Sequence, residues 1–272
     1  MESLEQRPFK VDTIENGLGD SVSFSLERGG IIRSLKLSST EILYMDPKTF
    51  NNPKVNVRGG IPILFPNSGP IQGLPQHGFA RTSSSWQRIE ESKRGYFKER
   101  LFASNESYAH EEYKYPFILE MEGLLDGPGK FRLTQSVRNA APLSSTPVEM
   151  PVAMGLHPYF RVPKGMRDKI SFDFPRGKIL DQNRNKWMND GTVSFDNPMT
   201  TMYVDIPEIG KLAIEASPLY RKIWVWSKES ETDEDFICIE PVVGDEGTLT
   251  ANPLLLKPGE VARGEMSIRL IK

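Results

Sequence analysis

Cysteine is almost absent from this chain of 272 residues, which contains only Cys238. A single cysteine excludes an intramolecular disulfide framework. Histidine is scarce as well, with three residues in the whole chain. One cysteine and three scattered histidines give no zinc-binding spacing, so no metal site is expected. The simplest interpretation of Cys238 is a small buried hydrophobic residue on a strand.

An excess of charge and long apolar runs are also missing. The 34 basic and 36 acidic residues leave a formal net charge of −2, which gives no electrostatic footprint for nucleic acid or an anionic membrane. No stretch of about twenty apolar residues could span a bilayer. Residues 1–12 are polar and lack the apolar run of a signal peptide. A cytoplasmic monomer without nucleic-acid or membrane partners is therefore expected.

Helical periodicity is rare, and short alternations of apolar and polar residues dominate instead. Helical turns are expected only near residues 46–49 and 109–112. The 22 glycines and 21 prolines divide the chain at short intervals. The predicted strands cover residues 22–26, 31–37, 117–125, 131–137, 148–154, 170–174, 212–215, 223–226, 236–239 and 265–271.

Many short strands with turns between them favour an all-β sandwich or barrel over alternating βαβ units. The first two runs flank Arg28-Gly29-Gly30 and are predicted to form a hairpin. No linker divides the chain, because strand patterns closely flank the proline-containing segment 140–147. Residues 1–272 are therefore expected to form a single domain.

Two of the three histidines lie in conformationally restricted contexts. His77 precedes a glycine and follows Pro75-Gln76, and His157 lies between Gly155-Leu156 and a proline. Glycine and proline restrict the backbone in the way that a preorganised site requires. Either histidine could also be a hydrogen-bonded structural residue. His110, beside two glutamates, is predicted to be a surface residue.

Glu240 is the second candidate for chemistry. It follows the apolar run 236–239 and precedes Pro241. Burial would raise the pKa of its carboxyl, which suits a general base near neutral pH. A strand-end glutamate that faces solvent is the alternative.

Two arginines could hold an anionic ligand such as a phosphate. Arg58 precedes a Gly-Gly pair and Arg81 ends the segment of His77; ordinary surface arginines are the alternative. No phosphate-binding glycine loop and no G-x-S-x-G elbow are present. Paired carboxylates for glycoside hydrolysis remain open, since their pairing is spatial. The acidic residues of segment 229–235 are predicted to form a solvated loop.

Four motifs in order carry a family resemblance: RGGIPILFP (58–66), LPQHGFAR (74–81), GLHPYF (155–160) and ICIEP (237–241). The sequence resembles the glucose-6-phosphate 1-epimerase (hexose-6-phosphate mutarotase) branch of the aldose 1-epimerases, within the galactose mutarotase-like superfamily. The resemblance spans essentially the whole chain. It implies a single large antiparallel β-supersandwich, an isomerase that interconverts the anomers of a hexose, and no cofactor.

The resemblance also implies roles for individual residues. His157 would be the general acid at the ring oxygen, and Glu240 the general base at the anomeric hydroxyl. His77 would orient the sugar. The substrate-binding positions match Arg58, Gln76 and Arg81, of which the two arginines would contact a phosphate. Because the reverse reaction swaps the acid and the base, both should titrate near neutrality and give a bell-shaped pH profile.

The chain departs from the family pattern at a substrate-binding aspartate in a late strand. Thr200 or Thr201 stands near that place, and Asp196 or Asp205 could substitute. GLHPYF is also closer to general aldose epimerases than to the phosphosugar branch. Three alternatives therefore stay open: an epimerase for unphosphorylated sugars, a non-catalytic sugar-binding or scaffold protein, and a glycoside-active enzyme.

Overall fold

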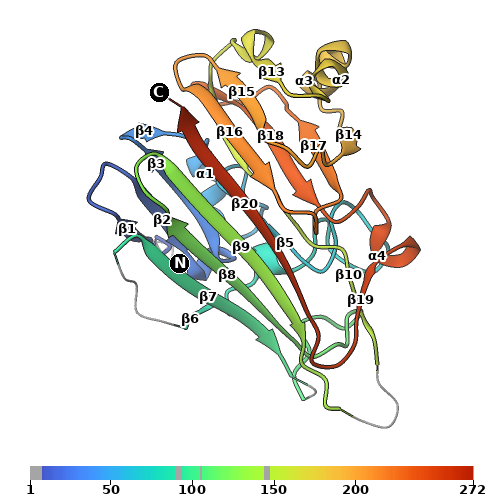
Figure 1. Cartoon of the computed structure of the whole chain (residues 1–272). Coiled ribbons are helices and arrows are strands. Elements are labelled where there is room, and N and C mark those ends of the chain that lie inside the picture. Colours follow the sequence, from blue (N-terminus) through green and yellow to red (C-terminus); the bar gives the residue numbers. More distant parts are fainter. Residues whose placement is uncertain (1–7, 90–93, 105, 144–147, 272) are drawn as a thin grey trace, which may run out of the picture.

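Two large antiparallel sheets dominate the computed structural model, which describes residues 8–89, 94–104, 106–143 and 148–271 (Figure 1). The expectations for the first seven residues and for 144–147 lie outside the described residues. The predicted all-β class is confirmed, since strands make up most of the regular structure.

The larger sheet has eight strands, and its arrows cross the front of Figure 1. The last strand of the chain lies in the middle of this sheet rather than at an edge. The order is β13 (Ser171–Asp173), β15 (Met202–Ile206), β16 (Gly210–Ala216), β20 (Val261–Ile271), β9 (Lys130–Asn139), β8 (Phe117–Leu125), β7 (Tyr96–Ala103) and β6 (Gln87–Arg88).

The second sheet has six strands and carries most of the residues predicted to be functional. Its order is β14 (Val193–Asp196), β17 (Lys222–Trp226), β18 (Glu234–Val242), β11 (Gly155–Leu156) and β5 (Ile63–Leu64), and β12 (Tyr159–Pro163) also pairs with β18.

Two smaller sheets complete the β-structure. The four-stranded sheet holds β1 (Asp12–Glu15), β2 (Ser21–Ser25), β3 (Ile31–Leu37) and β4 (Thr40–Glu41), and the two-stranded sheet holds β10 (Met150–Val152) and β19 (Leu254–Leu256).

Side-chain alternation gives the six-stranded sheet two different faces. Ile237 and Ile239 of β18 belong to the main hydrophobic core, which also includes Ile268 of β20 in the eight-stranded sheet. Successive residues of a strand point to opposite faces. Cys238 and Glu240 therefore point away from this core. The outer face of β18 is thus free to form a site.

The predicted hairpin is confirmed, because β2 and β3 pair antiparallel. A 3-10 turn, η1 (Leu26–Arg28), joins them and ends at Gly29, with φ of 79°. A Cβ on Gly29 would lie 2.0 Å from the carbonyl oxygen of Arg81. This glycine therefore lets the hairpin pack directly against the short 3-10 helix η2 (Ala80–Thr82) that carries Arg81.

Helices are few and short in the described chain. They are α1 (Pro47–Asn51), α2 (Gly177–Gln182), α3 (Arg184–Met188) and α4 (Thr248–Ala251), with a further 3-10 turn, η3 (Arg167–Lys169). Helix α1 confirms the turn predicted near residues 46–49: the Asp46 side chain caps it by accepting from the Lys48 N–H at 2.8 Å.

The turn predicted at residues 109–112 is not helical. His110 and Tyr113 form an isolated β-bridge, and the Glu112 N–H donates to His110 Nδ1 at 3.2 Å. This local hydrogen bond replaces a helical one. Helices α2, α3 and α4 were not predicted. None of the helices in the described segments is long and apolar enough to cross a lipid bilayer.

Candidate active site

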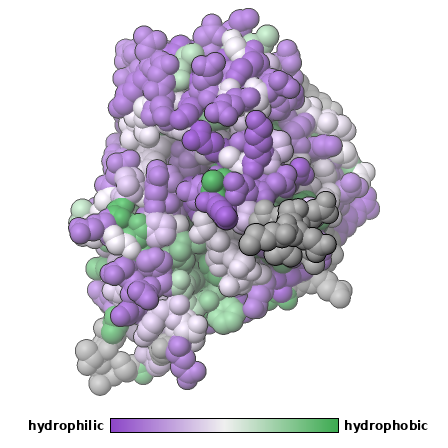
Figure 2. All heavy atoms as spheres, turned by 180° about the vertical axis from the view of Figure 1, so that it is seen from behind, coloured by the Kyte–Doolittle hydropathy of each residue, from purple (hydrophilic) through white to green (hydrophobic). Residues whose placement is uncertain are grey.

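A pocket of about 400 Å³ lies over the outer face of β17 and β18. Figure 2 views the molecule from behind Figure 1, where hydrophilic side chains dominate the upper part and hydrophobic ones gather lower down. All six residues predicted from the sequence line this pocket, although they come from distant parts of the chain: Arg58, Gln76, His77, Arg81, His157 and Glu240.

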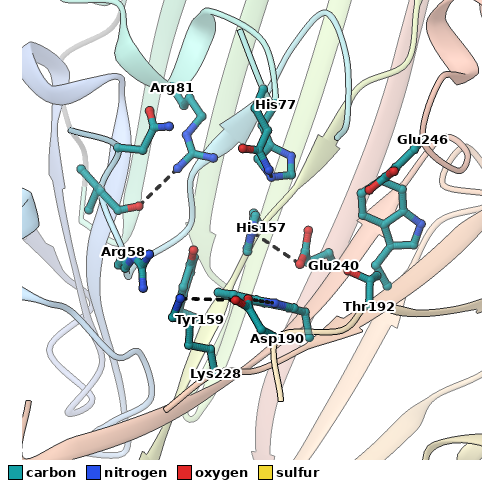
Figure 3. Close-up of a pocket in the computed structure, with 15 residues that line it drawn as sticks. Arg58, His77, Arg81, His157, Tyr159, Asp190, Thr192, Lys228, Glu240 and Glu246 are labelled. Carbon is teal, nitrogen blue, oxygen red and sulfur yellow. Dashed lines mark hydrogen bonds and ion pairs between the residues drawn. The ribbon is translucent and has the colours of Figure 1, made fainter. Parts of the chain in front are cut away.

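His157 and Glu240 form the central contact of the pocket (Figure 3). His157 Nε2 lies 3.4 Å from Glu240 Oε1, and both side chains are almost fully buried. His157 stands between β11 and β12, and its backbone N–H donates to the Pro62 carbonyl at 3.1 Å. Its ring stacks on Tyr159, with ring centroids 4.7 Å apart. These contacts hold the imidazole toward the carboxyl.

Burial moves the pKa values of this pair in opposite directions, because it disfavours whichever form is charged. It raises the pKa of Glu240 well above the ordinary value, and the charge of Arg81 partly opposes this. It lowers the pKa of His157 well below the ordinary value, helped by His77 and Arg81. The rise at Glu240 was expected. The pKa of His157, however, moves away from neutrality rather than staying near it.

His77 meets His157 edge to face, with ring centroids 5.2 Å apart. Its Nδ1 accepts from the Gly69 N–H at 3.0 Å, so the neutral ring carries its proton on Nε2. Burial, reinforced by Arg81, lowers the pKa of His77 to about 3. His77 is therefore neutral at physiological pH and presents an N–H donor. The amide nitrogen of Gln76 lies 3.4 Å from that Nε2.

Two consecutive left-handed residues set the position of His77. The φ angles are 65° at His77 and 76° at Gly78. A Cβ at Gly78 would lie 1.9 Å from the Phe65 carbonyl oxygen. Glycine is required there for both the backbone conformation and the close approach, as the sequence context suggested.

The two arginines occupy different positions. Arg81 is buried, and its Nη2 donates to the Val57 carbonyl at 3.3 Å. Burial lowers its pKa, while Tyr159, Glu240 and Cys238 oppose the shift; a guanidinium remains charged in this setting. Arg58 is exposed at the pocket rim. Arg81 is therefore a fixed positive charge near the Glu240 carboxyl, and Arg58 is accessible from solvent.

A third set of pocket residues was not predicted. Asp190 follows α3, and its carboxylate accepts from Trp226 Nε1 at 3.0 Å and Lys228 Nζ at 3.3 Å. Trp226 also meets the His157 ring edge to face, with an angle of 90° between the ring planes. The tryptophans at positions 224 and 226 were detectable, because they share one face of a predicted strand. Asp190 gave no local signal beyond an Asp-Gly turn.

The residues considered in place of the family's aspartate lie elsewhere. Asp196 is exposed and forms an ion pair with Lys222 at 2.9 Å, and Asp205 is exposed on β15. Thr200 and Thr201 line a separate cavity. Asp190 is a carboxylate that does line the main pocket.

The group that faces Glu240 argues against glycosidase chemistry. Glycoside hydrolysis uses two carboxyl groups across the scissile bond. Here the neighbour of Glu240 is the His157 imidazole. His110 lies outside the pocket and stacks on Phe79, with centroids 5.8 Å apart.

The family model for aldose 1-epimerase matches residues 10–269. The chain belongs to the aldose 1-epimerase family. A protein of Cenchrus ciliaris named "Putative glucose-6-phosphate 1-epimerase" is 25% identical, covering 89% of this chain and 79% of that protein. The aldose 1-epimerase fold is shared with Slr1438 of Synechocystis (TM-score 0.80, 22% identity, 99% of both chains). It is also shared with a galactose mutarotase related enzyme of Lactobacillus acidophilus (TM-score 0.74, 18% identity, 97% and 98% covered).

Membership of the aldose 1-epimerase family makes this protein an isomerase that interconverts sugar anomers. The predicted family and the β-sandwich fold are confirmed. The pocket of this epimerase also brings a ring nitrogen of His157, Cys238 Sγ and a Glu240 oxygen within 4.8 Å of one another.

Proposed function

We propose that the protein interconverts the α and β anomers of a hexose 6-phosphate, with His157 and Glu240 as the proton-transfer pair. The supporting observation is the 3.4 Å contact between their side chains inside the pocket. Hemiacetal opening needs one proton removed from the anomeric hydroxyl and one delivered to the ring oxygen. Rotation about the C1–C2 bond of the open sugar and reclosure give the other anomer.

The pKa directions support a pair that carries one shared proton. Neutral His157 with protonated Glu240 holds the same number of protons as the imidazolium with the carboxylate. The second arrangement serves ring opening when Glu240 accepts the anomeric proton and His157 protonates the ring oxygen. The fixed charge of Arg81 favours the carboxylate form. Substrate binding can therefore select the reactive arrangement without any exchange of protons with bulk water.

His77 is proposed to orient the sugar through its Nε2–H. A neutral donor can stabilise negative charge that develops on a reacting oxygen. Its edge-to-face contact with His157 places both rings beside the same cavity. Gln76, the adjacent residue, is proposed as a hydrogen-bonding partner of a sugar hydroxyl.

Arg58 and Arg81 are proposed to contact the phosphate. Guanidinium groups suit phosphate oxygens because they offer paired donors. The 25% identity to the Cenchrus ciliaris protein supports this substrate class. Because Arg58 is exposed at the rim and Arg81 is buried near Glu240, we assign the phosphate contact mainly to Arg58. Arg81 also acts on the proton-transfer pair.

Anomer exchange measured by NMR tests the reaction. Glucose 6-phosphate, glucose and galactose should exchange faster with the protein than alone, and glucose 6-phosphate fastest. Glu240→Gln and His157→Asn should each lower kcat by about 10²–10⁴-fold, because each removes one proton-transfer group. His110→Asn, outside the pocket, is the matched histidine control. Exchange at the spontaneous rate with all three sugars would instead indicate a non-catalytic sugar-binding protein.

The substrate class is tested by paired arginine variants. Arg58→Ala should lower kcat/KM for glucose 6-phosphate by about 10–100-fold, as expected for a lost charged hydrogen bond of about 1.5–3 kcal/mol, and leave glucose turnover nearly unchanged. Arg81→Lys should lower turnover of both sugars. Equal losses for both sugars in Arg58→Ala would contradict the phosphate assignment.

A second candidate is an epimerase for unphosphorylated sugars. One observation favours it: two further carboxylates, Asp190 and Glu246, line the pocket. Asp190 is paired with Lys228, so Glu246 is the residue that would repel a phosphate. In that case glucose or galactose exchanges faster than glucose 6-phosphate.

A further inference from the structure

Cys238 has no part in the proposed reaction, yet it lies directly beneath the reacting groups. It is free and fully buried. On β18 it stands two residues before Glu240, so both side chains point to the pocket face of the sheet. Tyr159 on β12 and Trp226 on β17 are its cross-strand neighbours. The thiol therefore lies behind the pocket lining, in a small apolar cluster with Tyr44, Tyr159 and Phe236, rather than in the core between the two sheets.

The donor atoms around this thiol have the chemistry of a metal site. A ring nitrogen of His157, Sγ of Cys238 and one oxygen of Glu240 lie within 4.8 Å of one another. Tetrahedral Zn²⁺, with bonds of about 2.0–2.3 Å, places neighbouring ligand atoms roughly 3.3–3.6 Å apart. The distance of 3.4 Å between His157 Nε2 and Glu240 Oε1 already matches this separation of neighbouring ligands. Any wider separation among the three atoms must shorten by at most about 1.5 Å to reach that geometry.

Two buried polar atoms at the same place have no hydrogen-bond partner. They are Nδ1 of His157 and Oε2 of Glu240, in side chains that are 4% and 2% exposed. Leaving such atoms unsatisfied costs about 1–3 kcal/mol each. A cation bound through Oε2 of the carboxyl would satisfy that oxygen. These atoms without partners are a second observation that points to a ligand, separate from the cysteine itself.

We propose that His157, Cys238 and Glu240 bind a soft divalent cation such as Zn²⁺, and that the bound ion inhibits the enzyme. Three protein ligands leave a fourth position open toward the cavity. A thiolate and a carboxylate neutralise the two positive charges. The nearby charge of Arg81 opposes any cation, so ions that bind thiolate weakly, such as Mg²⁺ and Ca²⁺, are excluded.

Inhibition rests on the proposed function, because the ion would occupy both proton-transfer groups. Binding itself does not depend on that function. Cobalt(II) is the appropriate probe, since it replaces zinc in tetrahedral sites and its thiolate complexes absorb in the near ultraviolet. Because the chain has a single cysteine, any thiolate-to-cobalt band from the monomeric protein reports on Cys238.

The experiment is a spectroscopic titration of the full-length protein with CoCl₂, followed by displacement with ZnCl₂. The wild type should develop the thiolate-to-cobalt band together with the visible bands of tetrahedral cobalt, and Zn²⁺ should abolish both. Cys238→Ala should lose the band. Glu240→Gln should weaken cobalt binding by at least about 10-fold, as expected for loss of a ligand. His110→Ala should bind as the wild type does.

Three results overturn the metal site. The first is a wild-type titration with no thiolate band. The second is an unchanged cobalt affinity in Glu240→Gln, which would show that the cysteine binds the ion without the carboxyl. The third is weak binding in which Mg²⁺ competes equally with Zn²⁺. If Cys238→Ala does not fold, as judged by circular dichroism, Glu240→Gln and the cation competition still decide the question.

The activity measurement separates this proposal from the proposed function. Zn²⁺ should inhibit anomer exchange by the wild type at a concentration about 100-fold lower than it needs for Cys238→Ala. The uninhibited rate of that variant should stay close to the wild-type rate, because the thiol contacts no reacting atom. A protein that shows the cobalt band without accelerating exchange would retain the metal site and refute the mutarotase assignment. If Zn²⁺ inhibits turnover equally in the wild type and in Cys238→Ala, the mutarotase assignment stands and the inhibitory metal site is refuted.

Discussion

At the scale of single residues, the pocket depends on how burial distributes one proton between two groups. The buried Glu240 carboxyl resists ionisation, and the buried His157 imidazole resists protonation. Arg81 acts on both, since its charge favours the carboxylate and disfavours the imidazolium. The side chains of His157 and Glu240 thus form a proton-exchange pair because they are buried together beside Arg81.

The pH dependence of kcat should reflect this pair. Activity requires one proton on the two groups together, so it falls when the pair gains a second proton or loses its only one. The acid limb should follow the lowered pKa of His157 and the alkaline limb the raised pKa of Glu240. The active range should therefore be wider than the interval of about pH 4.3–6.5 that the ordinary values of the two groups would give.

The measurement is kcat for anomer exchange across the pH range, preferably with an unphosphorylated sugar if that sugar is turned over. A phosphate ester titrates near pH 6 by itself, so glucose 6-phosphate can add a step of its own. A narrow optimum confined between about pH 4.3 and 6.5 would show that burial does not control the pair.

Sequence reasoning located six of the fifteen residues that line this pocket, but not their surroundings. His77 and His157 were detectable because glycine and proline restrict the chain beside them. Asp190 and Lys228 were not, because nothing local distinguishes a pocket-lining charge from a surface one. The opposite positions of Arg58 and Arg81, rim and interior, depend on burial that only the folded chain reveals.

At the scale of elements, β18 serves two purposes through its alternation. Ile237 and Ile239 belong to the core, while Cys238 and Glu240 face the pocket side. The loop of His77 adds a second rigid element, in which Gly78 lies against the Phe65 carbonyl. Short, well-packed elements therefore hold the reacting groups in place.

Gly78→Ala should destabilise the protein strongly and reduce turnover, because its Cβ would lie 1.9 Å from a backbone oxygen. We expect a loss of more than about 3 kcal/mol in the free energy of unfolding. Gly165→Ala is the matched control: its φ is 73°, against 76° at Gly78, but a Cβ there meets nothing within 4 Å.

The control should lose only about 1–2 kcal/mol, the cost of the left-handed conformation itself. Urea unfolding gives both values, and anomer exchange gives the effect on turnover. Equal losses in the two variants would mean that the loop of His77 yields to the added methyl group.

Strand prediction found many of the alternating runs but missed other strands, among them β14 and β15, whose burial also alternates. Every predicted run overlaps a strand, including β8 and β20. Strand β7 was missed because Glu99 is buried on the same face as Phe97 and Leu101, which obscures the apolar pattern. The shortest strands, such as β5 and β11, contain too few residues to show a period.

At the scale of the whole molecule, one hydrophobic core joins the sheets. It extends from Ile14 on β1 to Ile268 on β20. Gln135 of β9 reinforces the connection, since its Nε2 donates to the Leu64 carbonyl at 3.2 Å and its Oε1 accepts from the Tyr220 hydroxyl at 3.1 Å. A shared core of this kind supports the prediction of a single domain.

Thermal unfolding should therefore follow one cooperative transition. The calorimetric and van't Hoff enthalpies should agree, and circular dichroism and tryptophan fluorescence should give the same midpoint. Two resolved transitions would instead indicate that the sheets unfold as separate domains.

The central position of β20 has a consequence for synthesis of the chain. The strands β6 to β9 and the group β13, β15 and β16 all precede β20 in the sequence, yet only β20 joins them. A nascent chain can therefore complete two partial sheets, each with an unpaired edge at β9 or β16. Open edges of this kind are templates for aggregation. The final eleven-residue strand closes both at once, so its arrival ends the period in which the newly made protein is most vulnerable.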